Sequence, residues 1–160
     1  MTVDVTQLYE EVSQDEGRVL HPYYCSEGFA TVGIGHKILP DEPENLLPVH
    51  GVRDPVPADE GITEERCFEL FQADIQDAID GCESLYSNWE ELPQEMQHVL
   101  ANMVFQMGKT GVSNFRNMND AIAEQDFEKV AHEMVDSRWA QQQTPERAKR
   151  LQARVLALTN

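Results

Sequence analysis

Hydrophobic positions in the first part of the chain change from a helical spacing to a strand-like one. Apolar residues recur at helical spacing through residues 4–16, which predicts a helix that ends at Gly17. Residues 18–38 interleave three glycines with aromatic and branched side chains, a composition typical of short strands joined by turns. Pro40–Gly61 then holds five of the chain's eight prolines and shows no periodicity. We therefore expect a long surface loop there, with room for one short helical turn.

The chain from residue 63 onward returns to a helical spacing. Thr63 is a suitable N-cap for a long helix whose apolar stripe runs to Gly81, which is expected to end it. Pro93 can occupy the first turn of a second helix that extends to about Gln106. Apolar residues lie on nearly all sides of this second helix, which predicts that it is central and buried. Two glycines are expected to break it: Gly108 and Gly111.

Shorter helices are predicted for the rest of the chain: residues 115–124, 126–135, 137–142 and 145–155. In the last of these, Pro145 is expected at the first helical position, with Thr144 as the N-cap. The predicted elements make an α+β chain that is predominantly helical. A small lobe with a short antiparallel β-hairpin sheet (about 13–62) is joined by a long helix (about 63–81) to a helical lobe (about 82–160). The N-terminal helix is also expected to belong to the helical lobe.

The length and charge of the chain limit the possible functions. At 160 residues we expect a single domain, residues 1–160, with a ligand site in the cleft between its lobes. The formal net charge of −17 disfavours binding to nucleic acid, which needs clustered Lys and Arg. Adaptation to high salt and simple solubility both stay open as explanations of this charge. Five of the 12 basic residues lie between Arg138 and Arg154, which is either a patch for an acidic substrate or ordinary surface charge.

Membrane insertion and secretion are not expected from the sequence. No apolar run approaches the roughly 18 residues that span a membrane. The N-terminal sequence is acidic and lacks the basic and apolar regions of a signal peptide. We therefore expect synthesis in the cytoplasm, so that any work on a cell wall needs release by another agent.

Cysteine usage gives no sign of disulfides or of a metal site. The three cysteines are an odd number without a signal peptide, which indicates reduced thiols: Cys25, Cys67 and Cys82. No His/Cys cluster has the spacing of metal ligands, so neither a metal nor another cofactor is expected.

Three polar residues near the N-terminus are spaced in a distinctive way. Eight residues separate Glu16 from Cys25, and five separate Cys25 from Thr31. A Glu that ends a short helix, followed by a tight hairpin with two more polar groups, can line one cleft. Further motifs follow in order: TVGIGH (31–36), GIT (61–63), NMVFQMG (102–108), SRW (137–139) and TPERAKR (144–150). Together these motifs resemble the T-even phage lysozyme family.

The resemblance implies roles for the three N-terminal residues. Glu16 matches the family's general acid, and Thr31 matches the residue that helps to hold the attacking water. Cys25 stands where the family has an Asp that assists this water or stabilises charge at the sugar. An ordinary thiol is mostly protonated at pH 7, because its pKa is about 8.5. Four outcomes stay open: the thiolate activates water, the sulfur attacks the anomeric carbon, oxidation to a sulfinic acid restores an anion, or the thiol is inert.

The resemblance also implies residues that bind the substrate or support the site. Three residues resemble those that line the cleft or contact the glycan and its peptide: Phe105, Gln106 and Arg138. Arg147 resembles the Arg that pairs with the catalytic Glu. His36 and Asp74 resemble a structural ion pair between the hairpin and the long helix.

The function that the resemblance implies is that of an endolysin. Such an enzyme hydrolyses the β-1,4 bond between N-acetylmuramic acid and N-acetylglucosamine in bacterial peptidoglycan. It would act as a monomer, remain in the host cytoplasm until lysis and reach the wall through a holin-type pore. A weakened or inactive peptidoglycan-binding module is the main alternative, because Cys25 replaces the family's Asp. A virion structural protein that reuses the fold is a weaker alternative, which a persistent oligomer would reveal.

Overall fold

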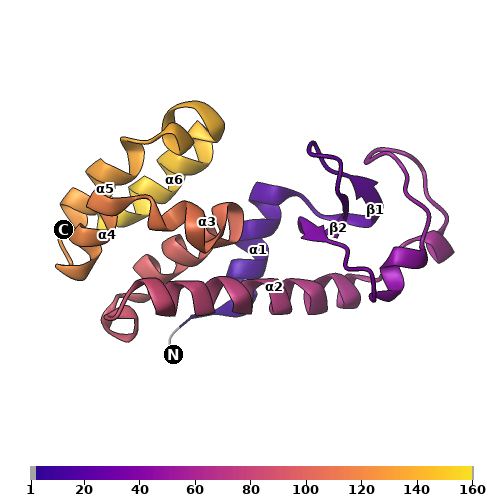
Figure 1. Ribbon diagram of the computed structural model, residues 1–160, viewed down its shortest axis with the longest axis horizontal. Coiled ribbons are helices and arrows are strands. Elements are labelled where there is room, and N and C mark those ends of the chain that lie inside the picture. Colours follow the sequence, from indigo (N-terminus) through magenta and orange to yellow (C-terminus); the bar gives the residue numbers. More distant parts are fainter. Residues whose placement is uncertain (1–2, 160) are drawn as a thin grey trace. The chain divides into compact units, whose positions relative to one another are not determined.

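Helices and one small antiparallel sheet make up the computed structural model, which describes residues 3–159 (Figure 1). These elements confirm the predicted class, an α+β fold that is predominantly helical with a small antiparallel sheet. The chain divides into two units, of which the first is Val5–Asp74 and the second is the rest of the described residues. Helix α2 (Glu64–Leu85) continues across the boundary, and helix α1 falls in the first unit. The single domain and the lobe boundaries stay predictions.

The first unit opens with a helix that leads into the sheet. Helix α1 (Val5–Glu16) buries the apolar face that its periodicity predicted. Gly17 then has a φ of 81°, a left-handed conformation that glycine adopts without steric cost, and the helix ends there. The strands pair antiparallel in the order β1-β2-β3 within the described residues. Their bounds are Val19–Tyr24 for β1, Ala30–Gly33 for β2 and His36–Lys37 for β3.

A tight turn joins β1 to β2. The backbone N–H of Cys25 donates to the carbonyl of Phe29 (2.9 Å), and the N–H of Gly28 donates to the carbonyl of Cys25 (2.9 Å). The register places Tyr23 opposite Thr31. Side chains alternate along a strand, so Cys25, two residues after Tyr23, belongs to the same side of the hairpin as Tyr23 and Thr31.

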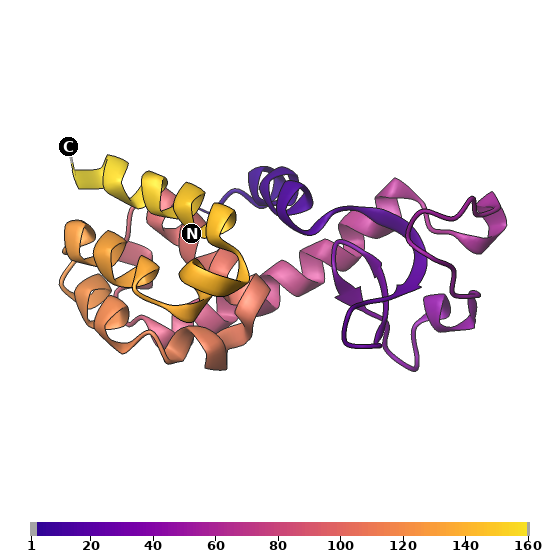
Figure 2. The ribbon, with the colours of Figure 1, turned by 90° about the horizontal axis from the view of Figure 1, so that it is seen from above.

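The segment between β3 and α2 is the predicted long loop. It contains two short 3₁₀ helices, where one turn was expected: Pro43–Leu46 and Ala58–Glu60. The loop also pairs with the outer edge of β1 (Figure 2), because the N–H of His50 donates to the carbonyl of Pro22 (3.0 Å). A second bond joins the N–H of Ile62 to the carbonyl of Leu20 (2.8 Å). These bonds satisfy polar groups of an edge strand and attach the loop to β1.

Helices alone form the second unit, within the part of the chain that the structure describes. After the end of α2, they are α3 (Gln94–Ser113), α4 (Arg116–Ala123), α5 (Phe127–Val135) and α6 (Pro145–Leu156), with short turns at Trp89–Glu91, Trp139–Gln143 and Ala157–Thr159. Every residue of α3 from Met96 to Val104 is buried, which confirms the predicted central helix. The helix predicted over 137–142 is a single π-helical turn over Trp139–Gln143. None of the helices in residues 3–159 is long and apolar enough to cross a membrane.

Two glycines that were predicted to end helices lie inside helices instead. A Cβ at Gly81 would lie 3.3 Å from Cγ1 of Val104, and α2 continues past this residue. A Cβ at Gly111 would lie 3.0 Å from Cβ of Met107, and α3 likewise continues. Both predictions were wrong because these glycines allow close packing rather than an unusual backbone conformation. Gly108, with a φ of 77° and a ψ of 163°, breaks the helical geometry of α3 as predicted.

Candidate active site

Glu16 is the last residue of α1, so its side chain leaves the helix just before the sheet begins. The residue is exposed. Its carboxylate lies against the turn between β2 and β3, because a Cβ at Gly35 would be only 3.2 Å from Oε1 of Glu16. Gly35 has a φ of 63°, which also favours glycine. The helix end and the glycine turn together leave the carboxyl group accessible to a ligand.

Cys25 and Thr31 are neighbours across the hairpin. Thr31 is buried, and its hydroxyl donates to the carbonyl of Phe29 at 2.8 Å. The pKa of the half-buried Cys25 thiol is below its ordinary value, mainly because backbone groups of Phe29 and Glu27 hydrogen-bond the thiolate. Desolvation opposes this shift, and a hydrogen bond with Thr31 adds to it. Cys25 therefore has a larger thiolate fraction near neutral pH than an ordinary cysteine.

Tyr23 belongs to the same region, although the sequence analysis did not identify it. Its phenol is half-buried, and the residue pairs with Thr31 across the hairpin. Burial raises the pKa of this phenol, and the negative charges of Cys25 and Glu16 raise it further. Tyr23 is therefore within electrostatic reach of both residues and stays a neutral hydrogen-bond donor at neutral pH. Its place two residues before Cys25 in a strand pattern is the sequence signal that could have indicated it.

His36 joins the sheet to α2 through the contact that the resemblance implied. Its Nδ1 lies 2.7 Å from Oδ2 of Asp74, and its Nε2 lies 2.8 Å from Oε1 of Glu42. Burial lowers the pKa of His36, but the two carboxylates outweigh burial and raise this pKa to about 9. The pair of His36 and Asp74 was expected, whereas Glu42 is an additional partner from the long loop. The network holds the turn that carries Gly35 against α2.

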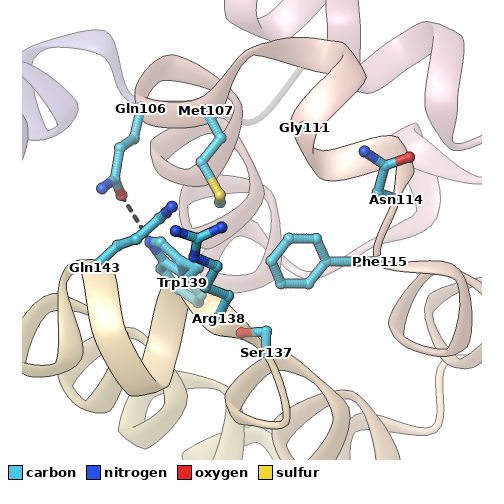
Figure 3. A pocket seen from close by; sticks show the side chains of 9 residues that line it. All are labelled: Gln106, Met107, Gly111, Asn114, Phe115, Ser137, Arg138, Trp139 and Gln143. Carbon is cyan, nitrogen blue, oxygen red and sulfur yellow. Dashed lines mark hydrogen bonds between the residues drawn. The ribbon is translucent and has the colours of Figure 1, made fainter.

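A pocket of about 470 Å³ lies in the second unit (Figure 3). Gln106 and Arg138, both expected to bind substrate, line it together with residues of α3, of the short connection that follows α3 and of the 137–143 segment. Nε1 of Trp139 donates to Oε1 of Gln106 (2.9 Å), and Nε2 of Gln106 donates to Oγ1 of Thr144 (3.1 Å). These bonds fix the side chain of Gln106 at the edge of the pocket. Arg138 is exposed, and its guanidinium points into the pocket (Figure 3).

Thr144 occupies the predicted N-cap position of α6, but its side chain makes no capping hydrogen bond. Its hydroxyl accepts a hydrogen bond from Gln106, which is distant in the sequence.

The remaining expected site residues also lie in the second unit. Phe105 is half-buried on α3 and is not among the residues that line the 470 Å³ pocket. Arg147 is buried, and its Nε donates to Oδ1 of Asn102 at 2.9 Å. The pairing of Arg147 with Glu16 stays a prediction.

The structure therefore groups the expected residues by unit. Five lie in the first unit: Glu16, Cys25, Thr31, His36 and Asp74. Four lie in the second unit: Phe105, Gln106, Arg138 and Arg147. Within residues 3–159, no group of His, Cys, Asp and Glu side chains could hold a metal ion. A carboxyl group, a thiol of lowered pKa and a fixed hydroxyl in one unit are groups that can exchange protons with a bound ligand.

Comparisons with known proteins agree with this arrangement. Residues 13–156 match the family model described as phage lysozyme. The chain is 33% identical, over 90% of its length, to a pre-baseplate central spike protein of Enterobacteria phage T4, of which it spans only 26%. It is 32% and 31% identical to two probable T4-type lysozymes of Dictyostelium discoideum, with 92% of each chain covered. These relatives support a lysozyme-like, glycoside hydrolase function at the level of the family. The chain belongs to the phage lysozyme family.

Proposed function

We propose that the protein is a muramidase that hydrolyses the β-1,4 bond between N-acetylmuramic acid and N-acetylglucosamine in peptidoglycan. The observation that carries this proposal is the placement of Glu16, Cys25 and Thr31 in one unit, with the carboxyl group of Glu16 accessible against the Gly35 turn. Glycoside hydrolysis needs a proton for the leaving oxygen and a group that directs a nucleophile to the anomeric carbon. Glu16 can supply the proton, and Cys25 and Thr31 of the hairpin can direct the nucleophile.

In the proposed reaction, Glu16 donates its proton to the glycosidic oxygen as the bond to the anomeric carbon breaks. A water held by Cys25 and Thr31 attacks that carbon from the opposite side and gives inversion. The water's proton passes to the Cys25 thiolate, and transfer of a proton back to Glu16 through solvent restores the resting state. The lowered pKa of Cys25 favours this assignment, because only the thiolate can accept the proton.

We also propose that the 470 Å³ pocket takes part of the glycan or its peptide. Arg138 is a cation whose planar fork of donors suits a carboxylate, a group that muramyl peptides carry. Gln106, fixed by its two hydrogen bonds, would offer a polar contact without losing much conformational entropy on binding. As an endolysin, the protein would act as a monomer and reach the wall through a holin-type pore.

The direct test is the release of reducing sugar ends from purified peptidoglycan. The parent should release them and Glu16→Gln should not, because glutamine cannot donate the proton at a useful rate. Glu10→Gln is the matched control, since Glu10 is an exposed glutamate on the same helix. Equal activity in the parent and in Glu16→Gln would remove Glu16 from the mechanism. No release by the parent in any redox or salt condition would favour a peptidoglycan-binding module.

The role of Cys25 has a separate test. Inversion predicts that the first product formed has the α configuration at its new reducing end, which NMR can follow before mutarotation. A glycosyl adduct on Cys25, detected by intact mass, would instead indicate that the sulfur attacks the anomeric carbon and that the configuration is retained.

A second candidate function is that of a virion component. The similarity to a phage spike protein over 90% of this chain favours it specifically. A structural component would persist as an oligomer in light scattering behind a sizing column, whereas an endolysin would elute as a monomer at all concentrations.

A further inference from the structure

A second depression lies in the first unit, on the side of β1 that the long loop covers. We name it the tyrosine groove: it has a volume of about 320 Å³ and is lined by Tyr23 and Tyr24 and by residues 49–52 and 54. This volume is at the lower end of the range for small-molecule sites. None of the residues given a role above lines it except Tyr23.

The loop wall of the groove is held in place by hydrogen bonds within the first unit. The N–H of His50 donates to the carbonyl of Pro22 in β1 (3.0 Å), and Nε2 of His50 lies 2.7 Å from Oε1 of Glu60. The turn that follows is closed by the N–H of Gly51, which donates to Oδ2 of Asp54 at 2.9 Å. A ligand therefore meets a preformed wall and loses little affinity to ordering the loop.

Tyr23 is shared by the groove and the candidate active site. It lines the groove, pairs with Thr31 across the hairpin and lies within electrostatic reach of Glu16 and Cys25. A chain-like ligand with one unit near Cys25 can thus reach Tyr23, at the groove, with a neighbouring unit. All the residues that line the groove belong to the first unit.

The chemistry of the lining favours an uncharged sugar. Tyr24 is 64% exposed and Val52 is 51% exposed, so the groove offers an aromatic ring and an apolar edge to solvent. The C–H face of a pyranose packs on such a ring, while its hydroxyl groups reach the tyrosine hydroxyls, His50 and Asp54 at the rim. No lysine or arginine lines the groove, and Asp54 does. With a net charge of −17 on the chain, this lining disfavours anionic lipids and polyanions.

We propose that the tyrosine groove is an accessory glycan subsite that holds an N-acetylglucosamine residue of the strand whose neighbouring bond lies at Glu16 and Cys25. This inference rests on the proposed function for the identity of the glycan. It adds a binding site on the long loop and assigns Tyr24 as the residue that determines affinity there.

The test is a titration of the ¹⁵N-labelled full chain with chitotetraose, the β-1,4-linked tetramer of N-acetylglucosamine, followed by NMR. The Glu16→Gln background prevents turnover during the measurement. The backbone amides of Gly51 and Val52 should shift and saturate. Tyr24→Ala should weaken this saturation by about tenfold, the loss expected for one aromatic contact. Leu46→Ala is the matched control, because Leu46 is 88% exposed on the same loop but does not line the groove.

Folding does not limit this test, because the Tyr24 side chain is mostly exposed and its removal leaves the core intact. Val52→Ser provides a second variant, at a residue of the long loop that lines the groove, and it should also weaken binding. The proposal is overturned if the Gly51 and Val52 amides do not shift, or if they shift equally in the parent and in Tyr24→Ala. It is also overturned if a stem peptide or anionic phosphatidylglycerol vesicles shift these amides and chitotetraose does not.

The outcomes for the groove and for the enzyme can be told apart. If chitotetraose shifts the Gly51 amide but the protein releases no reducing ends, the proposed glycan subsite stands and the proposed muramidase activity is wrong. If reducing ends are released in a Glu16-dependent way but the Gly51 amide does not shift, the proposed muramidase activity stands and the proposed glycan subsite is wrong.

Discussion

The ion network around His36 makes the stability of the protein depend on pH in a direction that can be worked out. His36 contacts Asp74 at 2.7 Å and Glu42 at 2.8 Å, and these carboxylates outweigh burial to raise its pKa from 6.5 to about 9. A difference of this size corresponds to about 3 kcal/mol, at about 1.4 kcal/mol per pKa unit. Because the folded pKa exceeds the unfolded one, this contribution is complete below pH 6.5 and is lost as the pH rises through 9.

His36→Gln removes the imidazole from this network, and urea unfolding at about pH 6 and about pH 10 measures the consequence. The free energy of unfolding of the parent should fall by about 3 kcal/mol more over this interval than that of the variant. Thiols, tyrosines and lysines titrate in both proteins, so their effects cancel in the difference. His132→Gln, at an exposed histidine on α5, should behave as the parent does.

Equal losses of unfolding free energy in the parent and in His36→Gln between the two pH values would show that the network does not stabilise the fold in this way. An NMR titration of the His36 ring provides a direct check, because a midpoint near 6.5 in the folded protein would mean that the carboxylates do not hold the proton. Glu42→Gln should move that midpoint down while leaving Asp74 as a partner.

Three further predictions follow from single contacts. Cys25→Asp should extend activity to lower pH than the parent, as measured by a pH–rate profile, because a carboxylate is ionised where a thiol is not. Gln106→Leu should lower the free energy of unfolding by about 1–3 kcal/mol, since it leaves two hydrogen-bonded partners without their contacts; thermal or urea unfolding checks this. Gly35→Ala and Gly28→Ala should each cost about 1–2 kcal/mol of stability, because both glycines have positive φ. Only Gly35→Ala should also reduce the release of reducing ends, because its Cβ would meet the Glu16 carboxylate at 3.2 Å, whereas nothing lies within 4 Å at Gly28.

The elements that could be predicted from the sequence are those set by local constraints. Helices α1 and α6 begin and end within a residue of their predicted bounds. Gly17 permits the left-handed conformation in which α1 ends, and Pro145 fixes a φ that suits the first residue of α6. Thr63 likewise accepts a hydrogen bond from the N–H of Arg66 at 3.0 Å, as a capping residue of α2 should. Each of these features depends on residues that are close in the sequence.

Two errors in the fold prediction, at Gly81 and Thr144, concern residues whose role depends on distant neighbours. Gly81 and Gly108 are the same residue type, yet one packs against Val104 and the other breaks a helix. A sequence pattern does not distinguish a glycine needed for space from one needed for its φ. Thr144 was expected to cap α6, but Gln106, 38 residues away, donates to its hydroxyl instead.

The residues of the candidate site also separate into those that local sequence spacing could place and those that depend on distant contacts. Glu16, Cys25 and Thr31 lie on consecutive local elements, so their spacing alone was enough to bring them into one unit. The contact between His36 and Asp74 spans 38 residues and depended on the family resemblance. Glu42 was not predicted because the loop that carries it has no periodicity from which to place its side chain.

The hairpin offers a physical reason why a thiol can stand where the family resemblance implies an Asp. The main stabilisation of the Cys25 anion comes from backbone groups of Phe29 and Glu27, not from a side chain chosen for sulfur. Backbone N–H groups in a tight turn serve a thiolate and a carboxylate alike, so the turn can keep its shape when residue 25 changes. The difference between the two residues then lies in the pH at which the anion forms, about 8.5 for an ordinary thiol and about 3.9 for an ordinary Asp. A change at this position therefore alters the pH range in which the site can accept a proton, while the position of Glu16 on α1 and of Thr31 on β2 does not depend on it.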